Sequence, residues 1–275
     1  MNLEKYQQYS RIARGLEQAD LVLKDARIIN VFTEEIIRGD IAIQDGIIAG
    51  IGSFQGKEER DLGGKYVCPG FIDSHLHLES TLVTPAELVT VASRHGTTTF
   101  IVDPHESANV SGLAGIDYIL EQTEDVKANV YVMMPSCVPA TGIDDNGCTL
   151  TAQDMAPYLN NSRILGLGEV MDSISVVQGD KGMHDKLELF EGRIRDGHAP
   201  FLVEGDLQAY AMAGIAKNHE CSFFDYAMRE RRNGPTILIR EGSAAPNLEA
   251  LVGGLVQRKM KRQGFWFLPD CHTNW

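Results

Sequence analysis

This 275-residue sequence lacks several features that would assign it to a common class. It has no run of about eighteen apolar residues for a membrane-spanning helix, and residues 1–15 lack the apolar core of a secretion signal. No glycine-rich GxGxxG motif or P-loop follows an apolar run, which disfavours binding of nucleotide phosphates. The net charge of −13 disfavours a nucleic-acid partner. We therefore expect a cytoplasmic protein without membrane or nucleic-acid partners.

Cysteine is scarce, and its spacing indicates no paired role. The five cysteines are odd in number, and no two of them are spaced as CxxC. A disulfide framework or a cysteine-based zinc site is therefore not expected. Hydrophobic residues make up 43% of the chain and charged residues 23%, which is enough for one large core or for a barrel with a small appendage.

The first part of the chain, residues 1–65, is rich in β-branched residues. Residues 20–54 are dense in isoleucine and valine and are broken by short turns that contain glycine and aspartate. This pattern predicts several short antiparallel strands, preceded by a short amphipathic helix within residues 1–15. A sheet this small needs another surface to pack on.

From about residue 66, eight short apolar runs alternate with segments long enough for helices. The runs are YVCPGFIDSH, TTTFIVDPHE, NVYVMMPS, RILGLGEV, RIRDGHAP, GIAKNHE, PTILIREGS and GFWFLPD. Runs that are apolar on both faces and separated by helical segments predict parallel βα units. Eight such units favour a (β/α)8 barrel over residues 66–275, and an open doubly wound sheet is the alternative.

Polar side chains follow these runs, at the strand ends where a barrel carries its active site. In chain order they are His75, His77, Asp103, His105, Glu106, Ser136, Cys137, Glu169, His198, His219, Glu220, Arg240, Glu241 and Asp270.

The first of these groups, His75-Leu76-His77, has the spacing of a metal-binding pair. Residues two apart on a strand point to the same face, so two imidazoles there can bind one cation. The pair alone is weak evidence, but Glu169, His198 and His219 supply ligand types at later strand ends. Imidazole and carboxylate without thiolate suit zinc, manganese or iron. A glutamate on the fourth strand is able to bridge two cations, which together would activate one water.

The sequence around these residues resembles known enzymes. PGFIDSHLHLES resembles the first-strand signature of the amidohydrolase superfamily. The blocks HGTTTFIVDPHESANV, MPSCVPAT, GLGEVM, DGHAP, NHEC and REGSAAPNLEAL resemble those of bacterial adenine deaminases, in the same order. The similarity extends from about residue 20 to about residue 268. It implies hydrolysis of adenine to hypoxanthine and ammonia in purine salvage, by a metal-dependent (β/α)8 barrel beside a small β-sandwich whose N-terminal portion lies in residues 1–65.

The resemblance also implies a ligand set. His75 and His77 match the first-strand ligands, and His198 and His219 match those of the fifth and sixth strands. Glu169 stands where many members of the superfamily carry a carboxylated lysine. A binuclear manganese site is implied, with iron or zinc as alternatives.

The mechanism that follows is attack of activated water on C6 of adenine, with a carboxylate moving protons to the ring and to the leaving amine. Asp270 is expected to be that carboxylate, because the superfamily uses an aspartate of the eighth strand. Glu220 is a second candidate for proton transfer or for contact with the adenine edge, and a role in fixing His219 is the alternative.

The remaining polar strand ends are expected to contact the substrate. Asp103, His105 and Glu106 should lie at the barrel mouth, where they orient substrate, hold an auxiliary ion or cap the next helix. Ser136 and Cys137 are expected to line the purine pocket.

The end of the sequence departs from the family pattern. The family has two adjacent aspartates followed by a basic residue and histidine, whereas this chain has Pro269-Asp270-Cys271-His272. Family members also continue for roughly as long again. We therefore expect a C-terminally truncated, incomplete barrel that is weakly active or inactive alone and forms homo-oligomers through its exposed edge. The alternatives to adenine deamination are a cyclic amide hydrolase, an amino-sugar deacetylase, and an inactive metal-binding fragment.

Overall fold

The computed structural model describes residues 1–242, 246–260 and 265–270, and only the backbone of residues 266–270. It contains two compact units, Met1–Gly70 and Phe71–Trp275. Within the described ranges, no helix is both long and apolar enough to cross a membrane.

The first unit is one sheet with a helix. Helix α1 (Leu3–Ala13) starts after Asn2, whose side chain accepts a hydrogen bond from the Lys5 N–H. The strands are β1 (Ala19–Asn30), β2 (Glu35–Gln44), β3 (Ile47–Gly52), β4 (Gly56–Asp61) and β5 (Tyr66–Val67), in the order β3-β2-β1-β4, with β5 also pairing with β1. Strand β2 is antiparallel to both β1 and β3, which confirms the prediction for residues 20–54, while β4 and β5 run parallel to β1.

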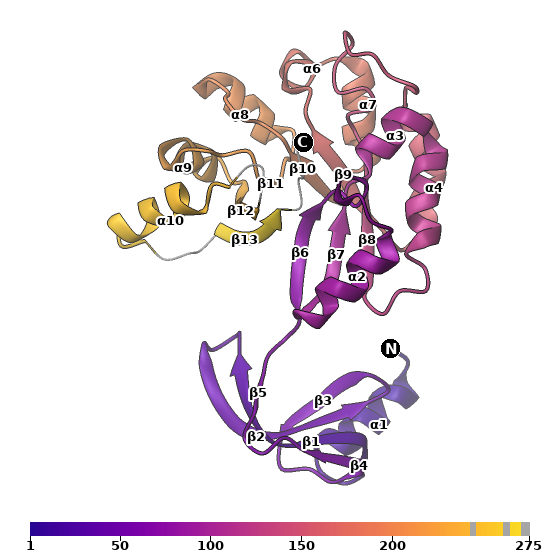
Figure 1. Cartoon of the computed structure of the whole chain (residues 1–275), viewed down its shortest axis with the longest axis vertical. Helices are drawn as coiled ribbons and strands as arrows, with labels where there is room; N and C mark the ends of the chain where they lie inside the picture. Colours follow the sequence, from indigo (N-terminus) through magenta and orange to yellow (C-terminus); the bar gives the residue numbers. More distant parts are fainter. Residues whose placement is uncertain (243–245, 261–264, 271–275) are drawn as a thin grey trace. The chain divides into compact units, whose positions relative to one another are not determined.

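The second unit is an eight-stranded parallel sheet (Figure 1). Its strands are β6 (Phe71–Leu76), β7 (Thr97–Val102), β8 (Asn129–Met134), β9 (Ile164–Val170), β10 (Ile194–Gly197), β11 (Lys217–Asn218), β12 (Thr236–Gly242) and β13 (Phe265–Asp270). Each strand is hydrogen-bonded to the next one along the chain, and β13 also contacts β6. A doubly wound sheet would reverse its strand order, so that alternative is wrong and the barrel is confirmed.

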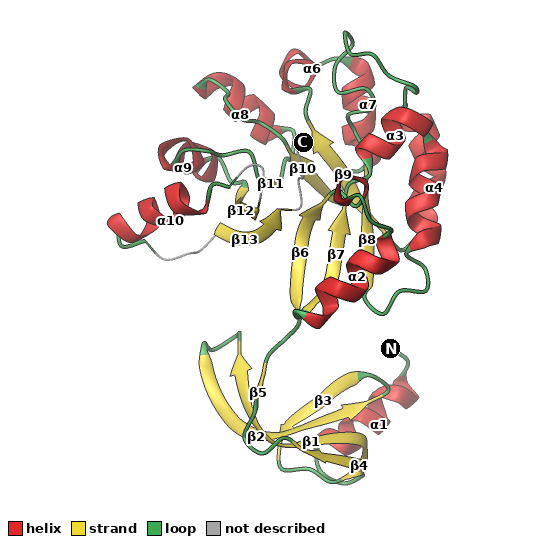
Figure 2. Cartoon of the chain, in the orientation of Figure 1, coloured by secondary structure: helices red, strands yellow, loops and turns green. Residues whose placement is uncertain are grey.

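Helices connect the strands and lie outside the sheet (Figure 2). They are η1 (Glu79–Thr81), α2 (Pro85–Arg94), α3 (His105–Ser111), α4 (Leu113–Gln122), α5 (Ala152–Met155), η2 (Ala156–Asn160), α6 (Ser173–Gln178), α7 (Lys181–Leu189), α8 (Glu204–Met212), α9 (Phe224–Arg232) and α10 (Leu248–Gln257). Because all eight strands run parallel, their carboxyl ends lie together at one end of the barrel.

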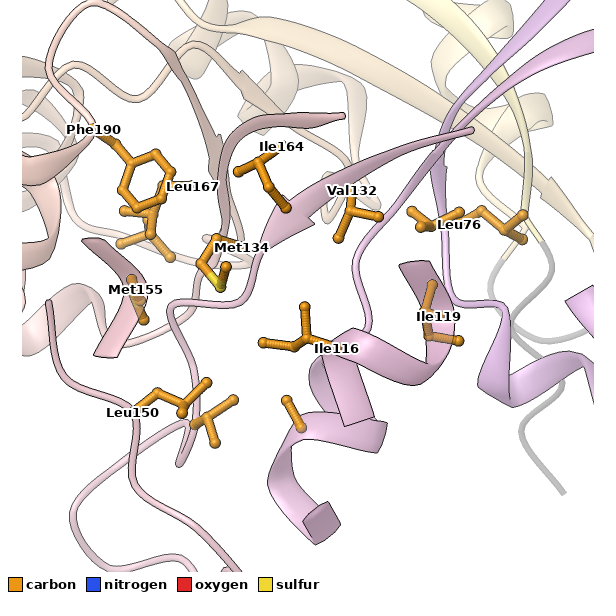
Figure 3. Close-up of a cluster of buried hydrophobic side chains, with 14 of the residues drawn as sticks. Leu76, Ile116, Ile119, Val132, Met134, Leu150, Met155, Ile164, Leu167 and Phe190 are labelled. Carbon is orange, nitrogen blue, oxygen red and sulfur yellow. The ribbon is translucent and has the colours of Figure 1, made fainter. Parts of the chain in front are cut away.

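Two separate hydrophobic clusters support the barrel. The larger core packs strands β6–β9 against the helices that follow them, and includes Leu76, Ile116, Val132, Leu167 and Phe190 (Figure 3). The smaller core lies among β12, β13, α9 and α10, and is built by Cys221, Tyr226, Ala227, Ile237, Ile239, Leu251, Leu255 and Phe265. Strand β8 contributes Val130, Val132 and Met134 to the larger core, whereas the two residues of β11 belong to neither cluster.

Candidate metal centre

The carboxylate of Glu169, at the end of β9, lies at the centre of the site. Its Oε1 is 2.7 Å from His75 Nε2, 3.0 Å from His77 Nε2 and 3.4 Å from His219 Nε2. Its Oε2 is 3.0 Å from His198 Nδ1. Glu169, His75, His77 and His219 are buried, and only the His198 side chain reaches solvent. The barrel thus brings together all five residues that the sequence predicted as metal ligands.

The hydrogen bonds on the far side of each ring decide which nitrogens face Glu169. His77 Nδ1 lies 2.7 Å from the Asp103 carbonyl oxygen, which only accepts, so this nitrogen carries a proton. His75 Nδ1 lies 3.0 Å from Asp196 Oδ2 and donates to it. In their neutral forms, both rings then direct Nε2 lone pairs at the Glu169 carboxylate. Lone pairs facing a carboxylate repel it unless a cation lies between them, so these residues fit a metal ion.

Buried atoms without a hydrogen-bond partner point to the same conclusion. Glu169 Oε1 and both ring nitrogens of His219 are fully buried and have no hydrogen-bond partner. Buried polar atoms are ordinarily satisfied, and leaving one unsatisfied costs about 1–3 kcal/mol. A metal ion bound by Glu169 Oε1 and by one His219 nitrogen would supply the missing partner.

The pKa values of the histidines show that the site attracts positive charge. Burial opposes a charged ring, but the adjacent carboxylates of Asp196 and Glu169 outweigh it and raise the pKa of His75 to about 9. Burial is likewise outweighed at His77, mainly by Glu169, and its pKa rises to about 10. Burial and the nearby His75 lower the pKa of His219 to about 4. Divalent ions are a second way to supply the positive charge that two protonated histidines would otherwise provide.

Among the described residues, four groups of three have ligand atoms close enough to share an ion. Two of them use only predicted ligands: His75, His77 and Glu169, and then Glu169, His198 and His219. Because Glu169 belongs to both, it is placed to bridge two cations. The other two groups are His75 with Asp196 and His219, and Asp103 with His105 and Glu169. The donors are nitrogen and oxygen throughout, which suits a divalent manganese, iron or zinc ion.

A glycine and two polar contacts fix the end of β9. Asp103 Oδ2 accepts a hydrogen bond of 2.7 Å from the Glu169 N–H. A Cβ atom at Gly168 would lie only 2.2 Å from that oxygen, so the close approach of Asp103 requires glycine there. Ser136 Oγ donates to the Glu169 carbonyl oxygen at 2.5 Å. Asp103 and Ser136 therefore support the position of Glu169, whatever other contacts they make.

Sequence reasoning missed Asp196 and Lys217. Asp196 is fully buried on β10, where its Oδ2 contacts both His75 Nδ1 and, at 3.0 Å, Lys217 Nζ. Lys217 Nζ also donates to the Ser74 carbonyl oxygen at 2.8 Å. The signal was an acid two residues before His198, within an apolar run that otherwise buries both faces.

The residues predicted to contact substrate differ in burial and in their distance from the ligand groups. Asp103 is buried, and its Oδ1, which has no hydrogen-bond partner, lies 3.6 Å from His105 Nδ1. Cys137 is buried as well, and burial raises the pKa of its thiol. Glu106 is exposed and accepts a hydrogen bond of 2.5 Å from Ser80 Oγ, apart from the four groups of possible ligands.

The two predicted catalytic acids also differ. Glu220 Oε1 lies 2.5 Å from Arg240 Nη1, 3.5 Å from His219 Nε2 and 3.9 Å from His198 Nδ1, so it borders the ligand group. Asp270 is the last residue of β13, at the carboxyl end of the strand, and pairs with Gly242. Its side chain lies outside the described part of the chain.

Comparison with known proteins gives this arrangement a family context. The model of the amidohydrolase family matches residues 66–250. An adenine deaminase of Desulfitobacterium hafniense is 55% identical over 270 residues, which are 98% of this chain and 48% of that protein. An adenine deaminase of Clostridium acetobutylicum is 47% identical over 95% of this chain and 46% of its own length. The chain thus spans about half the length of the curated relatives it matches.

Solved structures agree on the fold. A β-aspartyl dipeptidase of Fervidobacterium islandicum superposes with a TM-score of 0.62 at 12% identity, covering 92% of this chain and 73% of that one. A dihydroorotase superposes with a TM-score of 0.55 at 17% identity, covering 92% of this chain and 71% of that one. At such low identity the likeness concerns the fold alone.

Proposed function

This chain belongs to the amidohydrolase family, and we propose that it carries the metal site for hydrolysis of adenine to hypoxanthine and ammonia. In that reaction water adds to C6, the bond from C6 to the exocyclic nitrogen breaks, and ammonia leaves. The names of its relatives from D. hafniense and C. acetobutylicum support the substrate. The observation that carries the proposal is the position of Glu169 among four histidines, in the two groups that contain only predicted ligands.

The five ligands have separate tasks in this proposal. His75 and His77 would hold one ion and His198 and His219 the other, with Glu169 within reach of both pairs of histidines. A bound pair of divalent ions, for which we propose manganese, activates water near neutral pH. Asp196 and the Asp103 carbonyl oxygen fix the outward nitrogens of His75 and His77, so that the inward nitrogens face the ions.

Acidic residues around the ligands complete the proposed site. Glu220 borders His198 and His219 and is held by Arg240, so its carboxylate is placed to accept an N–H of the substrate. We propose Asp270 as the residue that moves the proton from water to the ring and the leaving amine.

The substrate pocket and the setting complete the proposal. Asp103, His105, Ser136 and Cys137 line the purine pocket, with Glu106 at its rim. The protein works in the cytoplasm as a homo-oligomer.

The test is an assay of the purified chain after loading with Mn²⁺. Adenine, adenosine, dihydroorotate and N-acetylglucosamine are supplied separately, and hypoxanthine, ammonia, acetate and the ring-opened form of dihydroorotate are measured. We expect ammonia from adenine alone. Glu169→Gln should abolish turnover and metal binding, while the exposed control Glu188→Gln should change neither.

Three outcomes would contradict parts of this proposal. Acetate from the amino sugar, or opening of dihydroorotate, would favour another amidohydrolase activity. Bound manganese without ammonia release would favour an inactive metal-binding fragment. Ammonia released from adenosine as readily as from adenine would contradict the free base as the substrate.

A further inference from the structure

Two of the proposed ligands lie just beyond the hydrogen-bonded part of their strands. Strand β11 has only two residues and is the shortest strand of the barrel sheet. Among the described residues, its ladder with β10 ends at the pair Gly197 and Asn218. His198 and His219 are the next residues on each strand. Backbone pairing between the two strands therefore stops one residue short of both histidines.

The side chain of Asn218 continues the pairing where the backbone ladder ends. Its Nδ2 donates to the Ala199 carbonyl oxygen at 3.2 Å, and its Oδ1 accepts from the Ala199 N–H at 3.3 Å. The same Oδ1 accepts from the Glu220 N–H at 3.2 Å. One buried carboxamide thus binds the residue after His198 and the residue after His219, as a peptide group of a neighbouring strand would.

Glu230, on α9, fixes the orientation of this carboxamide. Its carboxylate oxygens lie 2.7 and 2.9 Å from Asn218 Nδ2, and the Cys221 thiol donates to it at 3.1 Å. Because a carboxylate oxygen accepts, the Asn218 nitrogen must face α9, and its oxygen must face the two backbone N–H groups. Glu230 is 1% exposed, so water does not compete for these contacts.

Tyr210, on α8, holds the other side of the same segment. Its hydroxyl donates to the Val170 carbonyl oxygen at 2.6 Å and accepts from the His198 N–H at 3.0 Å. Val170 directly follows Glu169 in β9. The hydroxyl therefore links the backbone of one proposed ligand to the residue beside another. This link adds to the β9–β10 pairing at a point where the register of that ladder shifts.

From these contacts we propose that Asn218, braced by Glu230, and Tyr210 are positioning residues for the second cation. They hold His198 at the spacing from Glu169 and His219 that the shared ion needs, and Glu230 belongs to none of the groups of possible ligands. The inference rests on the proposed metal pair. Loss of partners that orient ligands weakens metal binding by about 10–100-fold in other proteins, and we expect at least a tenfold loss for the second ion alone.

The experiment is a titration of the metal-free 275-residue chain with Mn²⁺. Metal content per chain and electron paramagnetic resonance are measured, because a spin-coupled manganese pair differs from a single ion. We expect two coupled ions in the wild type. Tyr210→Phe and Asn218→Ala should each keep one ion at wild-type affinity and bind the other at least tenfold more weakly. Tyr210→Phe changes only a hydroxyl, so it decides the matter if Asn218→Ala does not fold.

The matched control is Arg163→Met. Arg163 precedes β9 at the strand end opposite Glu169, and its guanidinium donates to the Leu120 and Val130 carbonyl oxygens. This variant should lose stability and keep both ions. Two tightly bound ions in both test variants would overturn the inference and leave the metal centre intact. Equal weakening of both ions in the test and control variants would also overturn it, since that result marks a general structural effect. A wild-type chain that binds no manganese would overturn the proposed metal pair itself.

Discussion

The two units of the chain carry their charged side chains in different ways. In the first unit, most ion pairs lie at the surface: Arg38 Nε is 2.7 Å from Asp25 Oδ1, and both side chains are more than one-third exposed. In the barrel, Glu169 and Asp196 are at most 1% exposed and lie among histidines. Surface pairs gain little because water already solvates both partners, and buried charges must be paired to be tolerated at all.

This difference in burial distinguishes surface charges, which water solvates, from buried charges that a bound ion or a reaction requires. A fold gains little by burying carboxylates among imidazoles, because removing them from water costs about as much as their pairing returns. Such an arrangement persists where a bound ion or a reaction needs it, and perturbed groups of this kind collect at functional sites. The predictions below test the contrast from its most buried member to its most exposed one.

The largest effect is expected at Asp196. Replacing it by asparagine removes the charge that faces Lys217 and His75 and leaves the Lys217 ammonium without an anion. Breaking a buried pair by removing one partner costs about 3–5 kcal/mol, so Asp196→Asn should lower the free energy of unfolding by that amount. Chemical denaturation of metal-free protein measures it.

A second variant separates the charge from the shape of the site. Adding Lys217→Met to Asp196→Asn removes the unpaired charge, and the double variant should recover part of the lost stability. Asp206→Asn, an exposed change on α8, serves as the control and should change stability little. If Asp196→Asn lowers the free energy of unfolding no more than Asp206→Asn does, burial does not determine how much each of these charges stabilises the fold.

Much of the barrel could be predicted from the sequence, because its signals are local. Eight apolar runs gave eight parallel strands, and ligand-type residues at the strand ends gave the group around Glu169. Parallel strands bring their carboxyl ends together wherever the helices run, so no knowledge of the helices was needed.

The residues that support the site were harder to predict, because their partners are distant in sequence. Glu230 lies within MRERR, which resembles a solvated helix face, yet it is buried against Asn218. Its spacing of four and three residues from the buried Tyr226 and Ala227 was the available signal. The partner of Asp196 could not be predicted from spacing, because Lys217 lies one whole βα unit further along the chain.

A smaller effect is expected at Asp40, which is intermediate between the two kinds of charge. Lys24 Nζ lies 2.6 Å from its Oδ2, and the Asp25 and Phe54 N–H groups donate to the same carboxylate. Burial alone would raise the pKa of Asp40, but these hydrogen bonds outweigh it and lower the pKa below 3.8. We expect Asp40→Asn to destabilise the first unit by about 1–2 kcal/mol at pH 7, because the lost hydrogen bonds involve a charge.

The pH dependence of this effect follows from the direction of the shift. A carboxyl group whose folded pKa is lowered stabilises the fold above its unfolded pKa, near 3.8, and loses that contribution as the pH falls through its folded pKa. The difference between wild type and Asp40→Asn should thus be constant from pH 7 to about pH 5 and shrink below about pH 4. Hydrogen exchange of β1 and β2 amides gives the opening free energies. A difference that grows on acidification would contradict the assigned shift.

The smallest effect is expected at Arg38, whose side chain is 71% exposed beside Asp25. Both partners remain in contact with water and salt screens their attraction, so Arg38→Ala should change the opening equilibrium of the first unit by less than about threefold. A double-mutant cycle with Asp25→Asn isolates the pair. Asparagine suits position 25 because the backbone there has φ of 51°, which asparagine tolerates better than alanine. Coupling that is large, and that survives molar salt, would mean that the surface charges of the first unit stabilise it as buried charges would, and the contrast with the barrel would fail.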